Sequence, residues 1–209
     1  NALIYPDSTE PDGNTMVRSI NRFSAEDISE YCTAAGITVN AYLQAAFSET
    51  MHRLTREENF VYLTVNHGRG AAVEFADAVG MFVKTIAVGA SFPEEGHGSE
   101  KTADFIKRFS DELTENYASD IYPYTAIVNK FRFRPEVMFV YQGGMEGMNR
   151  EMAAEFSLGD VKFPINITVY PSDDGEMMIV SEADGKRYNS SDLEMLSQAF
   201  ASVVRSMLT

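Results

Sequence analysis

Few side chains of this sequence are placed where they could perform acid–base or nucleophilic chemistry. His67 follows a β-rich stretch and precedes Gly68-Arg69, which is a plausible site position, although a surface turn histidine is the simpler interpretation. His52 and His97 are interpreted as solvated residues, on the polar side of a helix and in a glycine-flanked loop. No Gly-x-Ser-x-Gly turn supplies a serine nucleophile, and one cysteine with three separated histidines excludes a zinc cluster.

The single cysteine, Cys32, lies in a predicted helix over residues 26–35. A lone helical cysteine is typically a small buried hydrophobic residue, so we do not expect Cys32 to act as a nucleophile. A chain with one cysteine forms no internal disulfide, which favours a reducing compartment and therefore the cytoplasm.

The side chain of Arg69 is suited to joining two segments of the chain through a carboxylate. Its planar guanidinium can hold a carboxylate through two parallel hydrogen bonds and so lock two chain segments together. The alternative interpretation is that Arg69 lies in an exposed turn and has no such partner. Carboxylate pairs are too numerous in this acidic chain for any one pair to identify a general acid and base.

The composition is that of a globular protein of one or at most two domains. Of the 209 residues, 44% are hydrophobic, 23% are charged, and the formal net charge is -14. The 17 Lys and Arg are outnumbered by 31 Asp and Glu and form no basic stripe, which excludes a nucleic-acid-binding surface. No apolar run approaches the ~20 residues that span a bilayer, and no signal peptide is recognisable, so we expect no membrane partner.

Alternating and β-rich stretches predict the strands that would position these groups. The predicted strands cover residues 15–23, 60–66, 81–88, 136–142, 163–170 and 176–182. The strand over residues 81–88 is expected to be buried and entered through a glycine hinge at Gly80, and residues 89–98 are expected to form a loop. The last two strands are expected to form a hairpin around residues 171–175.

Helices are predicted between these strands from amphipathic spacing and from the residues that start or end a helix. The second helix carries apolar residues at i, i+3 and i+4, which predicts a face buried in the core. The residues that place the helices are Ser24 and Gly36 for the first, Thr38 for the second, Ser99 for the third, Tyr122-Pro123-Tyr124 for a short fourth, and a Ser191-x-x-Glu194 capping box for the last.

Helices grouped between strands, together with a hairpin, predict the α+β class, with a mixed β-sheet covered by helices. A doubly wound nucleotide-binding fold is not expected. The sequence has no Gly-x-Gly-x-x-Gly after a strand and no Gly-x-x-x-x-Gly-Lys-Ser/Thr.

Two motifs that follow each other along the chain indicate the relationship of this protein more specifically than the fold class does. Ten residues after Gly68-Arg69 comes Val79–Thr85, a Gly-aromatic-Val-polar-Thr run, and both lie behind a Thr-capped helix. Three degenerate motifs accompany them: Thr38–Phe47, Ser119–Tyr124 and Pro135–Gln142. In this order and spacing the segments resemble the second half of the condensation domains of nonribosomal peptide synthetases. The His-His-x-x-x-Asp-Gly motif, which carries the catalytic histidine of that family, is absent from this sequence.

The sequence also departs from the family pattern. Lys84 stands at a position where the family has Asn, and Val88 and Gly89 replace a Leu-x-x-Arg ending. The Glu that follows the Ser119–Tyr124 motif in the family is missing, and an Arg-rich motif is only partly kept over residues 132–136. These departures leave open a divergent condensation domain, or an epimerisation-type or O-acyltransferase relative on the same fold.

The resemblance implies one chloramphenicol-acetyltransferase-like lobe, the C-terminal lobe of a condensation domain, over residues 15–209. Residues 1–14 are interpreted as a linker or a remnant of cloning, and a chain beginning Asn1-Ala2 is expected to extend further toward the N-terminus in nature. In the family reaction, a carrier-bound acceptor amine attacks a carrier-bound donor thioester and forms an amide.

The resemblance also assigns roles to residues. Arg69 would support the histidine loop of the N-terminal lobe, and Gly80, Phe82, Lys84 and Gln142 would line the substrate tunnel. No cofactor or metal would bind directly, because both substrates arrive on the phosphopantetheine arms of carrier domains. The partners would be the N-terminal lobe and these carrier domains, and the chain alone is expected to be inactive.

A lobe built to pair would expose an apolar patch or an open sheet edge, so we expect the isolated chain to self-associate, although its charge opposes this. In the family, the segment that corresponds to residues 143–159 is a latch that extends to the other lobe. The alternative is that these residues form a surface loop.

A third function, a non-catalytic carrier-binding or scaffolding module, also stays open.

Overall fold

The computed structural model describes residues 16–66, 82–93, 100–119, 124–132, 135–143, 161–172 and 175–208. The strands are β1 (Met16–Ser24), β2 (Asn59–Asn66), β3 (Lys84–Ser91), β4 (Val137–Tyr141), β5 (Ile165–Pro171) and β6 (Glu176–Asp184). The helices are α1 (Glu26–Ala35), α2 (Val39–Thr55), α3 (Thr102–Ala118), α4 (Tyr124–Phe131) and α6 (Ser190–Ser206). This arrangement confirms the predicted α+β class with a mixed sheet and helices.

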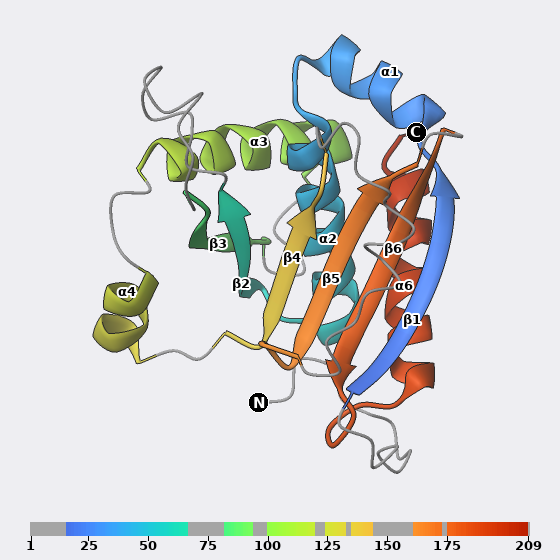
Figure 1. Ribbon diagram of the computed structural model, residues 1–209. Coiled ribbons are helices and arrows are strands. Elements are labelled where there is room, and N and C mark those ends of the chain that lie inside the picture. The colour runs from blue at the N-terminus through green and yellow to red at the C-terminus, as the bar shows by residue number, and fades with distance from the viewer. Residues whose placement is uncertain are drawn as a thin grey trace.

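The strands form one mixed sheet in the order β1-β6-β5-β4-β2-β3 (Figure 1). β4 runs parallel to both of its neighbours, β2 and β5, whereas the pairs β1–β6, β5–β6 and β2–β3 are antiparallel. The β5–β6 hairpin is therefore confirmed, and Gly175 beside it has the positive φ of 82° that favours glycine. Because β2, β4 and β5 are parallel, their carboxyl ends lie at the same edge of the sheet.

The core lies between the sheet and the helices α2 and α6, which pack behind it in Figure 1. Side chains of a strand alternate between its two faces. In β5, Ile165 and Val169 are buried in the core, and the intervening Asn166 and Thr168 are only partly buried. The apolar side of α6 faces the same core, with Phe200 among its fully buried members, as its spacing predicts.

Helix α2 is buried on more sides than its apolar spacing predicts. Thr38 caps it as expected, since its Oγ1 accepts a hydrogen bond from the Ala41 N–H at 3.1 Å. Gln44, Ser48 and Thr50 are nevertheless fully buried, although they lie outside the apolar stripe. They are tolerated there because each finds a hydrogen-bond partner within the protein, which offsets the loss of water.

Three of the predicted helix starts are wrong by one or two residues. The N-cap of α3 is Lys101 rather than Ser99. Ser24 is the last residue of β1, where it pairs with Glu176, so the N-cap of α1 is Ala25, without a side-chain cap. Helix α6 is capped by Asn189, whose Oδ1 accepts from the Asp192 N–H at 3.0 Å, while Asp192 Oδ2 accepts from the Asn189 N–H at 2.9 Å. This reciprocal pair is the capping box, two residues before the predicted Ser191 position.

Strand β3 is displaced along the chain from its predicted position. It begins at Lys84 rather than Met81 and continues through Gly89 to Ser91, so the predicted loop starts later than Gly89. Gly89 is exposed, and a Cβ added there would meet no atom within 4 Å. Since β3 is an outer strand of the sheet, a solvent-facing glycine is compatible with its pairing to β2.

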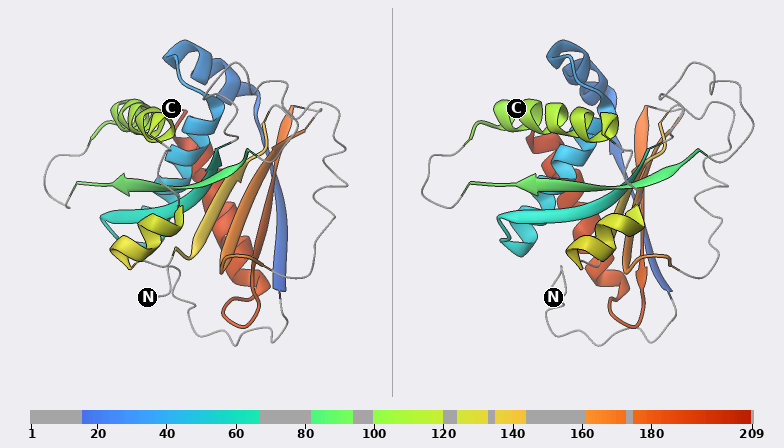
Figure 2. Two further views of the ribbon diagram at one scale, coloured as in Figure 1. Left: turned by 60° about the vertical axis from the view of Figure 1, so that its left-hand side comes forward. Right: turned by 90° about the vertical axis from the view of Figure 1, so that its left-hand side faces the viewer.

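The sheet consists of two parts that diverge from each other. Every residue of β2 registers with β3, whereas β2 and β4 register at one pair over their described residues, Leu63 with Met138. Figure 2 shows β2 and β3 running across the direction of the other strands, and Figure 1 shows β2 parting from β4 toward its carboxyl end. We call β2 with β3 the arm, and β1, β6, β5 and β4 the body.

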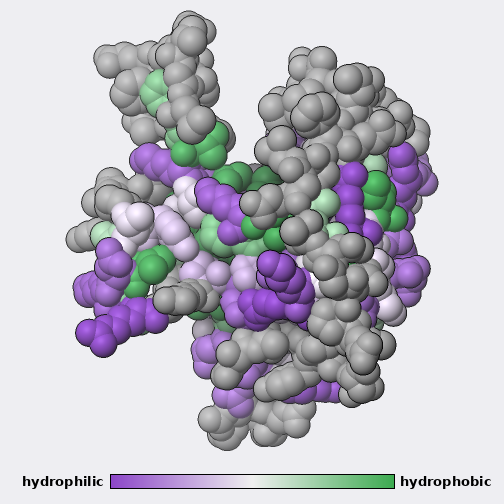
Figure 3. All heavy atoms as spheres, turned by 60° about the horizontal axis from the view of Figure 1, so that its bottom comes forward, coloured by the Kyte–Doolittle hydropathy of each residue, from purple (hydrophilic) through white to green (hydrophobic). Residues whose placement is uncertain are grey.

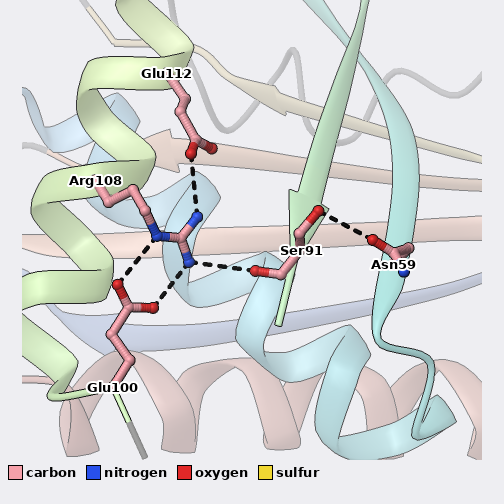
Figure 4. A network of polar contacts seen from close by, with 5 residues as sticks. All are labelled: Asn59, Ser91, Glu100, Arg108 and Glu112. Carbon is pink, nitrogen blue, oxygen red and sulfur yellow. Dashed lines mark hydrogen bonds and ion pairs between the residues drawn. The ribbon is translucent and has the colours of Figure 1, made fainter. Parts of the chain in front are cut away.

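A charged network holds the far end of the arm to α3 (Figure 4). Arg108 donates to both carboxylate oxygens of Glu100, at 3.0 and 2.8 Å, to Glu112 at 3.2 Å and to the Ser91 carbonyl at 3.2 Å. The Ser91 hydroxyl in turn donates to Asn59 Oδ1 at 3.0 Å, across the β2–β3 pair. The end of β3 opposite Lys84 is thus anchored.

The surface carries some large hydrophobic side chains among hydrophilic ones (Figure 3). Those more than two-fifths exposed are Ile20, Val61, Val83, Phe131 and Met195. β1 and β3 are the outer strands of the sheet that the described residues form. No helix within the described part of the chain is both long and apolar enough to cross a membrane.

Candidate functional site

Two of the residues predicted to line the site lie at one edge of the sheet. Lys84 opens β3 and registers with Asn66, the last residue of β2. Gln142 directly follows β4, and its backbone N–H donates to the Val169 carbonyl of β5 at 2.9 Å. Because β2 and β4 are parallel, the fold brings Lys84 and Gln142 to the same edge, where the arm parts from the body.

The remaining predicted site residues are only partly described. Phe82 lies two residues before β3 and is half-buried, whereas Lys84 is exposed. Arg69 and Gly80 fall outside the described residues, as do His67 and His97. The roles assigned to these positions therefore stay predictions.

Directly after Gln142, the backbone at Gly143 comes close to the Tyr141 ring. A Cβ on Gly143 would overlap ring carbons of Tyr141 and lie 2.8 Å from its Oη, so the Tyr141 side chain occupies the space of a side chain at 143. Tyr141 packs partly buried against the core. The position after Gln142 therefore favours glycine, and the Gln142 backbone itself is fixed by its hydrogen bond to Val169 of β5.

The polar groups of this edge can bind and orient a carbonyl group. An ammonium such as that of Lys84 has three donors, and a side-chain amide such as that of Gln142 both donates and accepts. Among the described residues of this edge there is no histidine or cysteine. A catalytic histidine would have to come from elsewhere in the chain or from a partner.

Two of the potentially reactive residues are accounted for by packing. Cys32 is 2% exposed, and burial raises the pKa of its thiol to about 11, as expected of a structural cysteine. His52 is not simply solvated, contrary to the prediction from its position in the sequence. Its ring stacks on Phe92 with centroids 4.2 Å apart, and its Nδ1 lies 2.8 Å from the Glu57 carbonyl oxygen.

A polar network lies behind the arm, buried at Gln44 and Tyr62 and partly buried at Asn40 and Tyr117, and the sequence analysis does not predict it. Gln44 Nε2 donates to Asn40 Oδ1 at 3.0 Å and to Tyr117 Oη at 3.1 Å, and Asn40 Nδ2 donates to the same Tyr117 Oη at 3.0 Å. Tyr62 of β2 donates its Oη proton to Gln44 Oε1 at 3.1 Å. The network therefore joins α2, α3 and the arm.

Burial sets the protonation of Tyr62 in this network. It raises the pKa of Tyr62 far above the usual range, against a smaller lowering by a hydrogen bond with Ser48. The phenol therefore stays neutral and remains a donor to the Gln44 amide oxygen. The signal that could have revealed the network is the polar line Asn40, Gln44 and Ser48 at i and i+4 beside the apolar stripe, which usually indicates a solvated face.

Comparison with known proteins defines the family. The model of the condensation domain family matches residues 5–209, so the chain belongs to that family. Bacitracin synthase 1 of Bacillus licheniformis is 23% identical over 213 aligned positions, which cover 95% of this chain and 4% of that protein. A linear gramicidin synthase from Brevibacillus parabrevis is 22% identical over 184 positions, which cover 82% of this chain and 3% of that protein.

Solved structures agree with this fold. A holo four-domain nonribosomal peptide synthetase bound to AMP and glycine matches 97% of this chain and 17% of its own, with a TM-score of 0.80 and 15% identity. The condensation domain from the monacolin K polyketide synthase MokA matches 99% of this chain and 51% of its own, with a TM-score of 0.75 and 13% identity. The chain thus spans about half the length of that condensation domain.

Proposed function

We propose that residues 15–209 form the C-terminal lobe of a condensation domain of a nonribosomal peptide synthetase. The observation that carries the proposal is the family match over residues 5–209, combined with coverage of 51% of a condensation-domain structure. The assignment to the C-terminal half is supported by the order of the motifs from Thr38 to Gln142, and by the absence of His-His-x-x-x-Asp-Gly from this sequence.

The proposed reaction is amide formation between two substrates on the phosphopantetheine arms of carrier domains. The acceptor amine attacks the carbonyl carbon of the donor thioester, the C–N bond forms, the C–S bond breaks, and the donor's thiol leaves with a proton. The catalytic histidine would come from the N-terminal lobe, so this lobe alone is inactive. The reaction would take place in the cytoplasm.

Within this proposal, the lobe supplies one wall of the substrate tunnel. Gly80, Phe82, Lys84 and Gln142 line it, and the position of Lys84 and Gln142 at one edge of the sheet supports this role. Arg69 pairs with the Asp of the histidine motif and so holds the histidine loop of the other lobe in shape.

Epimerisation is the second candidate. The epimerization domain from the third module of tyrocidine synthetase B matches 93% of this chain and 48% of its own, with a TM-score of 0.67 and 16% identity. The fold therefore accommodates either reaction. The departures at Lys84 and over residues 132–136 are compatible with such a relative.

The first test is to sequence the coding DNA immediately upstream of Asn1. An in-frame lobe containing His-His-x-x-x-Asp-Gly is the expected result. A start codon directly before this region would overturn the condensation mechanism and leave a carrier-binding or scaffolding role.

The second test assays the complete protein with donor and acceptor aminoacyl groups loaded on carrier domains. Release and chiral mass-spectrometric analysis of the product separates the candidates. We expect an amide-linked product to accumulate with time. Inversion of the α-carbon without amide formation would replace condensation by epimerisation, and an ester product would indicate O-acyl transfer.

A further inference from the structure

The arm is held to the body only loosely by the sheet itself. Over their described residues, β2 and β4 register at the single pair Leu63–Met138, near the amino end of β4. Beyond it the strands diverge, so backbone hydrogen bonds do not set the distance between Lys84 and Gln142 at their carboxyl ends. The orientation of the arm must therefore be set by the side chains of the helices that pack behind it.

Two kinds of contact lie behind the arm on α2. Phe47 contacts both parts of the sheet, Tyr62 of the arm and Phe139 of the body, and the burial of apolar surface is non-directional. The hydrogen bond from Tyr62 Oη to Gln44 Oε1 is directional, and both residues are 0% exposed. A shift of the arm would break this bond and leave a buried amide oxygen without a partner.

The Gln44 side chain is itself fixed in direction. Its Nε2 is committed to Asn40 on its own helix and to Tyr117 on α3, at 3.0 and 3.1 Å, so its Oε1 points at Tyr62. On the same side of the fold, Asn116 of α3 donates to the Ala87 carbonyl of β3 at 2.8 Å. The arm is thus oriented by hydrogen bonds from α2 and α3.

We propose that Gln44 is a positioning residue, whose amide orients the arm through Tyr62 and thereby places Lys84 relative to Gln142 at the edge of the site. The part of this inference that concerns catalysis rests on the proposed condensation function. The part that concerns the arm does not depend on any activity.

The test variant is Gln44→Met combined with Tyr62→Phe in the complete protein. It removes both partners of the bond between Tyr62 and Gln44 and keeps the side-chain volumes close. Asn40 Nδ2 stays bonded to Tyr117, while the partly buried Asn40 Oδ1 loses its Gln44 donor. The matched control is Ser181→Ala with Ser197→Ala. These fully buried hydroxyls lie 2.7 Å apart and join β6 of the body to α6, away from the arm.

The primary measurement is amide hydrogen exchange by mass spectrometry. We expect exchange to accelerate about tenfold or more in peptides covering residues 59–66 and 84–91 of the test variant, with peptides from residues 165–184 unchanged. The control should show the reverse pattern. Unchanged exchange in the arm of the test variant would overturn the proposal whatever the protein's activity.

Steady-state kinetics of the complete protein test the consequence for the site. If the parent forms amides, the test variant should lose about tenfold in kcat with an unchanged thermal midpoint, because misplacing a site by about 1 Å costs up to about a hundredfold. The control should keep its kcat. A loosened arm with parental kcat would refute the role of Gln44 in placing the site. A parent without amide-forming activity would refute the proposed function and leave the exchange result standing.

Tyr62→Phe alone keeps the proposal testable if the double variant does not fold. It removes one hydroxyl and leaves Gln44 bonded to Asn40 and Tyr117. The same exchange pattern at smaller amplitude is expected, and parental exchange in β2 and β3 would contradict the proposal.

Discussion

Phe47 of α2 stacks on Phe139 of β4, with ring centroids 4.8 Å apart and an interplanar angle of 27°. The same Phe47 ring meets Tyr62 of β2 edge-on at 5.4 Å and Phe200 of α6 at 5.9 Å. One buried side chain therefore contacts the arm, the body and the opposing helix. The two parts of the sheet share this aromatic cluster even where their strands part.

Replacing Phe47 by Ala should lower the free energy of unfolding by about 3–5 kcal/mol, because a fully buried ring is lost and the surrounding rings cannot collapse into its space. Urea denaturation of the folded domain measures the change. Phe131→Ala, at a ring that is 67% exposed on α4, is the control and should change stability by less than about 0.5 kcal/mol. Equal effects of the two variants would show that Phe47 is not a centre of the core.

The cap of α6 distinguishes the structure from the sequence-based prediction. Asn189→Ala should cost about 1–2 kcal/mol, because it removes the acceptor for the buried Asp192 N–H. Ser191→Ala, at the position predicted from the sequence, is exposed and should be nearly neutral. Thermal or urea unfolding of the two variants checks this. A larger loss for Ser191→Ala would place the capping box at the Ser191-x-x-Glu194 position instead.

These two cases show what the sequence can and cannot establish about this fold. The burial of Phe47 follows from i, i+3, i+4 spacing alone. The cap of α6 does not, because an Asn-x-x-Asp box and a Ser-x-x-Glu box overlap within residues 189–194, and only tertiary packing selects between them.

The sequence indicates only some of the residues that the structure brings together at and behind the candidate site, for a similar reason. The resemblance selected Lys84 and Gln142, and the sheet brings both to one edge. Gln44 was not assigned a role, because polar residues four apart on a helix usually face solvent. Here Tyr62 and α3 cover that side, and the contacts with α3 join residues more than 70 positions apart.

The thiol of Cys32 should be unreactive in the folded protein. A pKa of about 11 leaves roughly one thiol in a thousand as thiolate at pH 8, and the side chain is 2% exposed. Reaction with a chromogenic disulfide reagent at pH 8 should therefore be slow until denaturant is added. Met195→Cys, at a site that is 45% exposed on α6, is the positive control and should react at once. Rapid labelling of Cys32 in the native protein would contradict its burial.

The Glu100–Arg108 pair predicts a pH-dependent contribution to stability. Hydrogen bonding to Arg108 holds the pKa of Glu100 below its ordinary value, against a smaller opposing effect of burial. A carboxyl whose folded-state pKa is lowered stabilises the fold fully above its unfolded pKa of about 4.3, and this contribution is lost as the pH falls through the folded pKa. Both side chains are partly exposed, so the contribution is about 0.5–1 kcal/mol.

Glu100→Gln tests this through urea unfolding at pH 7 and at pH 3.5. The variant should be less stable than the parent at pH 7, and the difference should shrink at pH 3.5. Asp111→Asn is the control, because its pair with Lys107 is more than half exposed on both sides and should contribute little at either pH. A difference independent of pH would mean that the ionised form of Glu100 is not what anchors the end of β3.

Arg69 provides the sharpest mutational test of the proposed condensation function. If its guanidinium holds the Asp of the histidine motif through two parallel bonds, Arg69→Ala should reduce the kcat of amide formation in the complete protein by about tenfold or more. Arg69→Lys should rescue little, since an ammonium keeps the charge but not the fork geometry. Arg53→Ala, which removes an exposed arginine paired with Glu49 on α2, should leave the rate unchanged. Full rescue by Lys would show that charge alone suffices, and a parental rate in Arg69→Ala would remove Arg69 from the support of the histidine.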